Sequence, residues 1–98
     1  MNDSKNKVAI VTGGGSGIGK ASAAALANDG YSVVITGRRE DPLNNTVKEI
    51  GSDKVFAITC DVGQPESVKN LFSKTLEKYG RLDVLFNNAG GGAPKKLL

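Results

Sequence analysis

Glycine occupies five of the seven positions from residue 13 to residue 19, in the stretch Thr12-Gly-Gly-Gly-Ser-Gly-Ile-Gly19. The run before it, Val8-Ala9-Ile10-Val11, is too short for a helix and has the apolar, β-branched composition of a buried strand. The segment after it is rich in alanine and has helical spacing. A helix presents unpaired N–H groups and partial positive charge at its first turn. The sequence therefore predicts that this glycine turn binds an anion such as phosphate.

The spacing Gly13-x-x-x-Gly17-x-Gly19 differs from the G-x-G-x-x-G pattern of many dinucleotide-binding turns. We expect Gly13 to make the tight exit from the strand and Gly19 to let helix and strand pack closely. Gly17 would leave room for a pyrophosphate, with the hydroxyl of Ser16 beside it. A purely structural turn is the alternative that the glycines alone leave open. The candidate contact residues of the turn are Gly13, Gly15, Ser16, Gly17, Ile18 and Gly19.

The rest of the chain alternates apolar runs with segments of helical periodicity. Asp41-Pro42 is typical of a helix cap and first turn, and Pro65 is typical of a helix start. The expected strands span residues 7–11, 32–36, 54–60 and 82–87, and the expected helices begin at Gly17, Asp41 and Pro65 and end at Gly30, Gly51 and Gly80. The predicted inner face of the first helix holds Ile18, Ser22, Ala25 and Leu26, and that of the third holds Val68, Leu71, Phe72, Thr75, Leu76 and Tyr79.

Strands that alternate with helices and are apolar on both faces predict an α/β fold with a parallel sheet covered on two sides. Right-handed crossovers favour the strand order 3-2-1-4. We therefore expect part of a Rossmann-type, doubly wound sheet with about four strands and three helices. Ligands of such sheets bind beyond the carboxyl ends of the strands, where the order reverses between strands 1 and 4. The glycine turn follows strand 1, so the motif and the topology indicate the same place.

Composition limits the classes of function. Ninety-eight residues fit one domain, which we expect at 7–90 with tails at 1–6 and 91–98. A net charge of +3 and five aromatic residues give little support for a nucleic-acid partner. No apolar run approaches the ~20 residues of a membrane span, and the first residues lack the apolar core of a signal peptide. The single cysteine, Cys60, excludes an internal disulfide and is expected to be a small buried hydrophobe in a reducing, cytoplasmic setting.

Three motifs resemble those of the short-chain dehydrogenase/reductase family. Thr12-Gly-x-x-x-Gly-Ile-Gly19 is similar to the family's coenzyme motif, Cys60-Asp61-Val62 to its acidic segment after strand 3, and Asn87-Asn88-Ala89-Gly90 to its segment after strand 4. They occur in the family's order and at compatible distances. The resemblance implies a dinucleotide cofactor and, in the full-length family, hydride transfer between NADPH and a carbonyl or alcohol.

The resemblance also implies roles for single residues. Asp61 would accept a hydrogen bond from the adenine amino group, and Val62 would pack on the adenine ring. A carboxylate that merely flanks the helix starting at Pro65 is the alternative for Asp61. Asn87 would hold the central sheet together. The expected cofactor contacts after strand 4 are Asn88, Ala89 and Gly90, the last two close to the ribose.

The choice of coenzyme depends on the end of strand 2. An NAD site usually places a carboxylate there for the ribose 2′-hydroxyl, whereas NADP needs positive charge for the 2′-phosphate. This chain has Thr36-Gly37-Arg38-Arg39, and Arg38 can offer a planar fork to phosphate. Family members with Gly-Arg here generally resemble NADP users. The alternative is that both arginines are solvated and partly neutralised by Glu40 or Asp41. We expect NADP rather than NAD.

No catalytic residue is expected in these 98 residues. The family uses a tyrosine acid/base with a lysine four residues later, which lowers the tyrosine pKa. Tyr31 is followed at that distance by Ile35 and Tyr79 by Asp83, so neither fits. The sequence thus resembles the N-terminal, coenzyme-binding half of a reductase, without the segments that form the substrate pocket and the family's usual oligomer contacts. A catalytically inactive nucleotide-binding or interaction module is the alternative, and the substrate stays open.

Overall fold

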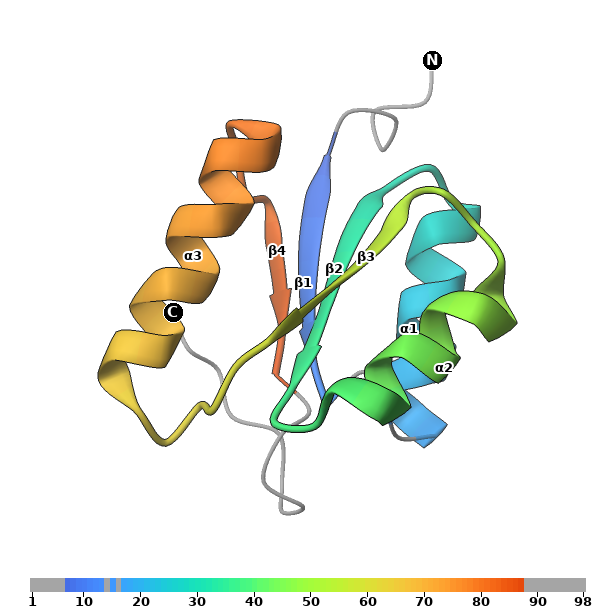
Figure 1. Cartoon of the computed structure of the whole chain (residues 1–98). Helices are drawn as coiled ribbons and strands as arrows, with labels where there is room; N and C mark the ends of the chain where they lie inside the picture. Colours follow the sequence, from blue (N-terminus) through green and yellow to red (C-terminus); the bar gives the residue numbers. More distant parts are fainter. Residues whose placement is uncertain (1–6, 14, 16, 88–98) are drawn as a thin grey trace.

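The computed structural model describes residues 7–13, 15 and 17–87, which form a layered α/β unit. Four strands and three helices alternate along this part of the chain, as Figure 1 shows. The elements are β1 (Val8–Thr12), α1 (Gly17–Asn28), β2 (Ser32–Gly37), α2 (Glu40–Ile50), β3 (Val55–Thr59), α3 (Pro65–Tyr79) and β4 (Val84–Phe86). Each predicted element is present, with bounds that shift by a few residues.

The strands form one parallel sheet in the order β3-β2-β1-β4, which confirms the predicted topology. β1 is paired on both sides, with Ile10 aligned to Val34 of β2 and to Leu85 of β4. All five residues of β1 are buried, whereas Phe56 of the edge strand β3 is 44% exposed. The parallel arrangement brings all four carboxyl ends to one edge of the sheet, at the bottom of Figure 1.

Helices cover both faces of the sheet. α1 and α2 lie on one face and α3 lies on the other (Figure 1). The alternation of strand side chains gives each face its own apolar cluster. The cluster under α1 and α2 holds Val11, Ala23, Ala27, Val33, Ile35, Leu43 and Val55. The cluster under α3 holds Ile10, Val34, Ile58, Cys60 and Leu71. The expectation that Cys60 is a small buried side chain is confirmed.

The inner face of α1 differs from the predicted one. Its buried residues are Gly19, Ala23 and Ala27, spaced four apart. Ile18 is 67% exposed and Ala25 is exposed, so their placement on the inner face was wrong. The three buried residues are glycine or alanine, and their small side chains allow the helix axis to approach the sheet closely. The face of α1 that packs on the sheet is therefore determined by how closely the helix backbone can approach the strands, and not by the hydrophobicity of its side chains.

α2 begins earlier than predicted. Its cap position is Arg39, with extended backbone, and Asp41 lies inside the first turn instead of capping it. Glu40 and Asp41 are favourable there because carboxylates are attracted to a helix N-terminus. Pro42 costs nothing at this position, since the first-turn N–H groups have no intrahelical partner.

α3 matches its prediction except at one residue. It begins at Pro65 and is followed by Gly80 with a φ of 78°. Leu71 and Thr75 are buried as expected, and the Thr75 hydroxyl donates to the carbonyl of Leu71 at 2.8 Å, so a polar residue is accommodated on the inner face. Leu76 is 49% exposed, and its placement on that face was wrong.

None of the helices in the described part of the chain is long and apolar enough to cross a membrane.

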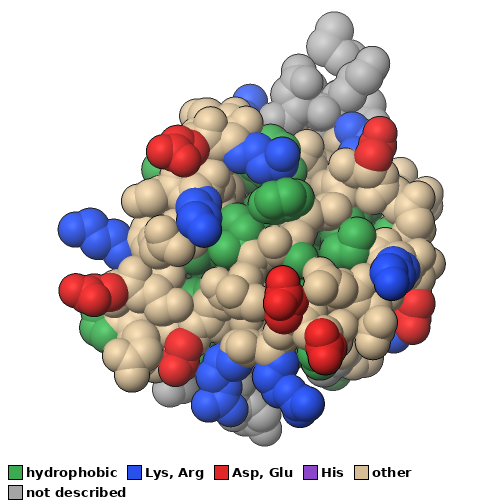
Figure 2. Space-filling view, viewed as in Figure 1, with side chains coloured by type: hydrophobic (Ala, Val, Ile, Leu, Met, Phe, Trp, Pro, Cys, Tyr) green, Lys and Arg blue, Asp and Glu red, His purple; other side chains and the backbone are tan. Residues whose placement is uncertain are grey.

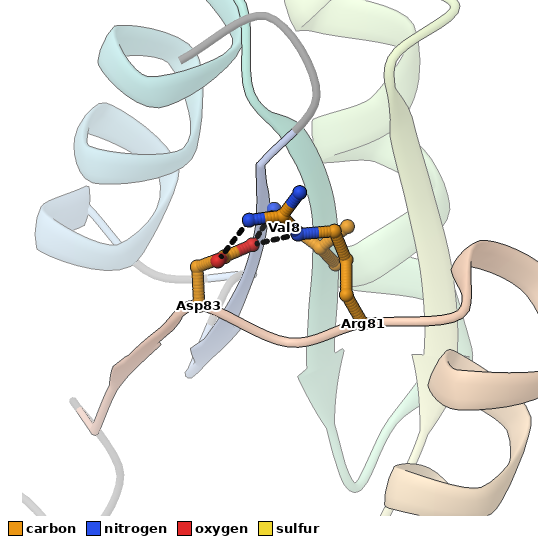
Figure 3. Close-up of polar contacts among 3 residues, drawn as sticks. All are labelled: Val8, Arg81 and Asp83. Atoms are coloured by element: carbon orange, nitrogen blue, oxygen red, sulfur yellow. Dashed lines mark hydrogen bonds and ion pairs between the residues drawn. The ribbon is translucent and has the colours of Figure 1, made fainter. Parts of the chain in front are cut away.

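A polar cluster joins β1 to β4 at the amino ends of the strands (Figure 3). The carboxylate of Asp83 accepts a hydrogen bond from the Val8 N–H at 2.9 Å through Oδ2. Arg81 binds both carboxylate oxygens, with Nε donating to Oδ2 at 2.9 Å and Nη2 to Oδ1 at 2.7 Å. These contacts lower the pKa of Asp83 from its ordinary value, the Arg81 hydrogen bond most of all. They also raise the pKa of Arg81.

Candidate functional site

The predicted site residues that the structure describes follow the carboxyl ends of neighbouring strands. Gly13, Gly15 and Gly17 follow β1, Arg38 and Arg39 follow β2, and Asp61 and Val62 follow β3. Figure 2, seen from the same side as Figure 1, shows Lys and Arg side chains at this edge beside Asp and Glu side chains, with other charged side chains spread over the rest of the face. The topology therefore brings the separate motifs to one edge of the sheet. Ile18 and Gly19 lie on the first turn of α1, and Ser16, Asn88, Ala89 and Gly90 lie outside the described residues.

The glycines of the turn have different physical reasons to be glycine. Gly13 has a φ of 68°, which a residue with a side chain adopts only under strain. A Cβ on Gly15 would lie 2.7 Å from the Cβ of Pro42, so this glycine is required by packing against α2. A Cβ on Gly17 would meet no described atom within 4 Å. Of these two glycines, Gly17 is therefore the one at which the absent side chain leaves open space among the described residues.

Two apolar side chains at this edge are exposed. Ile18 is 67% exposed on the first turn of α1, and Val62 is 49% exposed directly after Asp61. Apolar residues next to polar hydrogen-bonding groups suit a flat aromatic ligand, because such a ring has apolar faces and a polar rim. Both lie in motifs that the sequence singled out. The described residues thus fit the adenine and pyrophosphate parts of a dinucleotide.

Asp61 is fixed by three local hydrogen bonds. Its Oδ1 accepts from the Gly63 N–H at 3.0 Å, and its carbonyl accepts from the Gln64 N–H at 2.9 Å. Its own N–H donates to Oγ of Ser67, on the first turn of α3, at 2.9 Å. Among the described residues no donor reaches Oδ2. The carboxylate therefore takes part in the turn before α3, as the alternative interpretation expected, and still presents one oxygen for a ligand.

The arginines after β2 form no ion pair with their neighbours. Arg38 and Arg39 are both exposed, and within residues 7–13, 15 and 17–87 neither Glu40 nor Asp41 makes a salt bridge with them. Neutralisation by these carboxylates, which the sequence left open, is therefore not seen in the described contacts. Two guanidinium groups at the end of β2 provide unpaired positive charge at the edge where the other motifs meet.

Side-chain hydroxyls form a polar layer at the carboxyl ends of β1 and β2. Oγ1 of Thr12 donates to Oδ1 of Asn87 at 2.9 Å and joins β1 to the end of β4. This contact agrees with the sheet-holding role expected of Asn87. Thr36, aligned with Thr12 on β2, is fully buried, and its hydroxyl has no partner in the described part of the chain. Sequence reasoning gave no role to Thr12, although a threonine that ends an otherwise apolar strand was a usable signal.

Tyr79 lies away from the edge where the predicted site residues meet. Tyr79 ends α3 near the opposite edge of the sheet (Figure 1) and packs against the cluster under α3. Burial raises the pKa of Tyr79, whereas an acid/base tyrosine needs a lowered pKa. Among the described residues, no group of three or more His, Cys, Asp or Glu side chains could hold a metal ion.

A family profile described as short chain dehydrogenase matches residues 7–98. The chain belongs to this family. Among its curated relatives, short-chain dehydrogenase reductase 3a of Arabidopsis thaliana is 44% identical over 84 residues, which are 86% of this chain and 33% of the relative. The chain therefore spans about a third of that relative's length, and it corresponds to the N-terminal region of the family.

Solved structures of the same family match the fold. A short chain dehydrogenase from Bacillus anthracis superposes with a TM-score of 0.87 at 39% identity, over 92% of this chain and 37% of that one. A variant of actinorhodin polyketide ketoreductase, solved with NADPH, gives a TM-score of 0.83 at 39% identity, over 92% and 35% of the two chains. A 3-ketoacyl-(acyl-carrier-protein) reductase from Brucella melitensis, complexed with NADH, gives 0.77 at 33% identity, over 83% and 33%. Both coenzymes thus occur among these neighbours.

Proposed function

We propose that this chain is the NADP(H)-binding part of a short-chain dehydrogenase/reductase-like oxidoreductase, with the cofactor domain at residues 7–90 and a cytoplasmic location. When bound, NADPH supplies a hydride for transfer to a carbonyl carbon. The residues of this chain bind and orient the cofactor. They are not proposed to move the proton, because no described group fits that task. The alternative is a nucleotide-binding or interaction module without catalysis.

The pyrophosphate is proposed to lie at the N-terminus of α1. The first N–H groups of a helix have no intrahelical partner and carry partial positive charge, so they favour a bound anion. Gly17 leaves room for this approach, since a Cβ there would meet no described atom within 4 Å. Gly13 has a φ of 68° directly after β1, a backbone conformation that favours glycine at the exit from the strand.

The adenosine end is proposed to lie between the loops that follow β2 and β3. Asp61 would accept a hydrogen bond from the adenine amino group through Oδ2, and Val62 and Ile18 would cover the faces of the ring. The two loops are joined directly, since the Cys60 N–H donates to the carbonyl of Gly37 at 2.8 Å. Gly37 precedes Arg38, so the adenine loop and the arginine loop are held in fixed relation.

The observation that carries the choice of NADP is the unpaired pair of arginines after β2. No carboxylate lies in the first two positions after Gly37, where an NAD site usually has one. Arg38 and Arg39 form no ion pair among the described residues, so their charge is available to a 2′-phosphate. A guanidinium binds phosphate through two parallel hydrogen bonds, which adds geometric selectivity to charge.

Isothermal titration calorimetry of the full chain with NADPH and with NADH tests the proposal. We expect measurable binding of NADPH and weaker binding of NADH, with the difference shrinking at high salt because it is electrostatic. Failure to bind either nucleotide would overturn the nucleotide-binding function. Tighter binding of NADH would overturn the choice of NADP alone. Adenosine 2′,5′-bisphosphate is a useful further ligand, because it carries the adenine and the 2′-phosphate without the nicotinamide.

A further inference from the structure

We propose that Ser67 is a positioning residue for adenine recognition: its hydroxyl fixes the backbone of Asp61 so that one carboxylate oxygen faces the adenine amino group. The inference rests on the proposed function, since it names a further residue of the same nucleotide site. Ser67 lies on the first turn of α3 and does not belong to any of the motifs that the sequence singled out. Its Oγ accepts the hydrogen bond of the Asp61 N–H at 2.9 Å.

Ser67 is suited to this role because its helix is rigidly seated. Leu71, one turn later on the same side of α3, is 2% exposed and belongs to the cluster under that helix. Asp61, by contrast, lies in a loop between β3 and α3. The hydrogen bond from its N–H therefore ties a loop residue to an element whose position the core determines. Residues 62–64 are exposed, so the contacts of Gly63 and Gln64 with Asp61 come from within the loop itself.

A second set of contacts orients the carboxylate itself. The Gly63 N–H donates to Oδ1 at 3.0 Å, and a Cβ on Gly63 would lie only 3.3 Å from the same oxygen. The turn thus closes tightly around Oδ1 and leaves Oδ2 without a donor among the described residues. The preceding residue, Cys60, is held to β2 through its bond to the Gly37 carbonyl. Asp61 is consequently fixed from β2 on one side and from α3 on the other.

Loss of the Ser67 hydroxyl would release the α3 side of this support. The Asp61 N–H would lose its acceptor, and the loop could rotate the carboxylate away from the adenine. A purely structural serine at a helix start would behave differently, because it would weaken every ligand of the site to the same extent. The discriminating quantity is therefore the preference for adenine over a base that lacks the amino donor.

The experiment compares adenosine 2′,5′-bisphosphate with inosine 2′,5′-bisphosphate, in which a carbonyl replaces the amino group, by calorimetric titration of the full chain. We expect the unchanged chain to prefer the adenosine ligand by about tenfold or more, since a hydrogen bond to a charged group is among the stronger ones. Ser67→Ala should reduce that preference by about three- to tenfold. Ser67→Thr, which keeps the hydroxyl, and Ser73→Ala, a matched change at an exposed serine of α3, should retain it. Asp61→Ala should abolish it.

The outcomes separate this inference from the proposed function. No binding of either ligand to the unchanged chain would overturn both. Binding without an adenine preference, or an equal loss of both ligands in Ser67→Ala, would overturn the positioning role and leave nucleotide binding intact. If Ser67→Ala does not fold, the temperature dependence of the NMR chemical shift of the Asp61 amide proton is measured in the unchanged chain instead. A steep, solvent-like dependence would overturn the proposal, and a shallow one, typical of a hydrogen-bonded amide, would support it.

Discussion

The carboxylate of Asp83 lies against the first residue of β1, where its Oδ2 accepts the Val8 N–H at 2.9 Å (Figure 3). The two residues are 75 positions apart in the chain. At the other end of the same strand pair, the hydroxyl of Thr12 donates to Asn87. Side-chain hydrogen bonds therefore hold β4 to β1 at both ends of a three-residue strand.

Replacing the Asp83 carboxylate should destabilise the chain in a pH-dependent way. The pKa of Asp83 is lowered in the folded state, first by the Arg81 hydrogen bond and then by the Val8 N–H. A lowered carboxyl pKa stabilises the fold above the unfolded pKa of about 3.9, and this contribution disappears as the pH falls through the folded pKa. We expect Asp83→Asn to have a lower urea midpoint at pH 7, with the gap to the unchanged chain closing below about pH 4.

Asp53→Asn is the matched control for this pH series, because Asp53 is exposed and makes no hydrogen bond or ion pair among the described residues. Its urea midpoint should follow that of the unchanged chain at every pH. A gap for Asp83→Asn that stays constant from pH 7 to pH 3 would contradict the assigned role of the carboxylate.

Thr12 and Thr36 are register partners on adjacent strands, yet their replacement by valine should have opposite effects. Thr12→Val removes the hydroxyl bonded to Asn87 and should lower the unfolding free energy by about 1 kcal/mol. Thr36→Val removes a fully buried hydroxyl that has no described partner, so stability should stay the same or rise by up to about 1 kcal/mol. Urea unfolding followed by circular dichroism measures both, and equal losses would refute the distinction.

Gly15 and Gly17 should also respond differently to the same substitution. In Gly15→Ala the new methyl group would lie 2.7 Å from the Cβ of Pro42, and we expect a loss of about 1–3 kcal/mol in unfolding free energy. In Gly17→Ala the methyl group meets no described atom, so stability should change by less than about 1 kcal/mol. The same methyl would occupy the proposed pyrophosphate approach and weaken NADPH binding by roughly tenfold.

A thermal melt and a calorimetric titration of each glycine variant distinguish these roles. A Gly17→Ala chain that binds NADPH as well as the unchanged chain would contradict the proposed phosphate position. A Gly15→Ala chain of full stability would show that the loop can move away from Pro42.

Arg38→Ala should weaken NADPH binding much more than NADH binding. A charge-assisted arginine–phosphate contact contributes on the order of 1.5–3 kcal/mol to binding. NADH has no 2′-phosphate, so its binding should not depend on this contact. Calorimetric titration with both nucleotides gives the two differences. Lys69→Ala, which removes an exposed cation from α3, is the control for general electrostatic attraction. An equal loss of affinity for both nucleotides in Arg38→Ala would refute the role of Arg38 in recognising the 2′-phosphate.

The order of elements and the sheet topology could be predicted from the sequence because their signals are local or follow general rules. The apolar runs locate the strands, Pro65 and Gly80 mark the ends of α3, and the right-handed crossover fixes the strand order. The face of α1 could not be predicted, because Ile18 is the most hydrophobic residue of its first turn and yet the small residues Gly19 and Ala23 face the sheet. Periodicity reports a face only when the large side chains are the buried ones.

The long-range contacts of the site were beyond the reach of the sequence for a different reason. The motif glycines were recognised, but the contact between Gly15 and Pro42 requires knowing how the loop after β1 meets α2. The bond between Asp61 and Ser67 depends on how the turn before α3 closes. The bond between Asp83 and Val8 depends on the register of β4 against β1. Each becomes visible only when the elements are placed.

The short β4 has a consequence for the order in which the chain folds. β1, β2 and their connecting helix α1 are contiguous in sequence, whereas β4 must find β1 across 74 or 75 residues. Closing a longer loop costs more entropy, and the strand that compensates for this cost has only three paired positions besides the hydrogen bonds at its two ends. We expect β4 to dock last on the pathway and to leave first when the molecule begins to unfold. The strand that completes the binding edge would then be the part of the sheet that unfolds most easily.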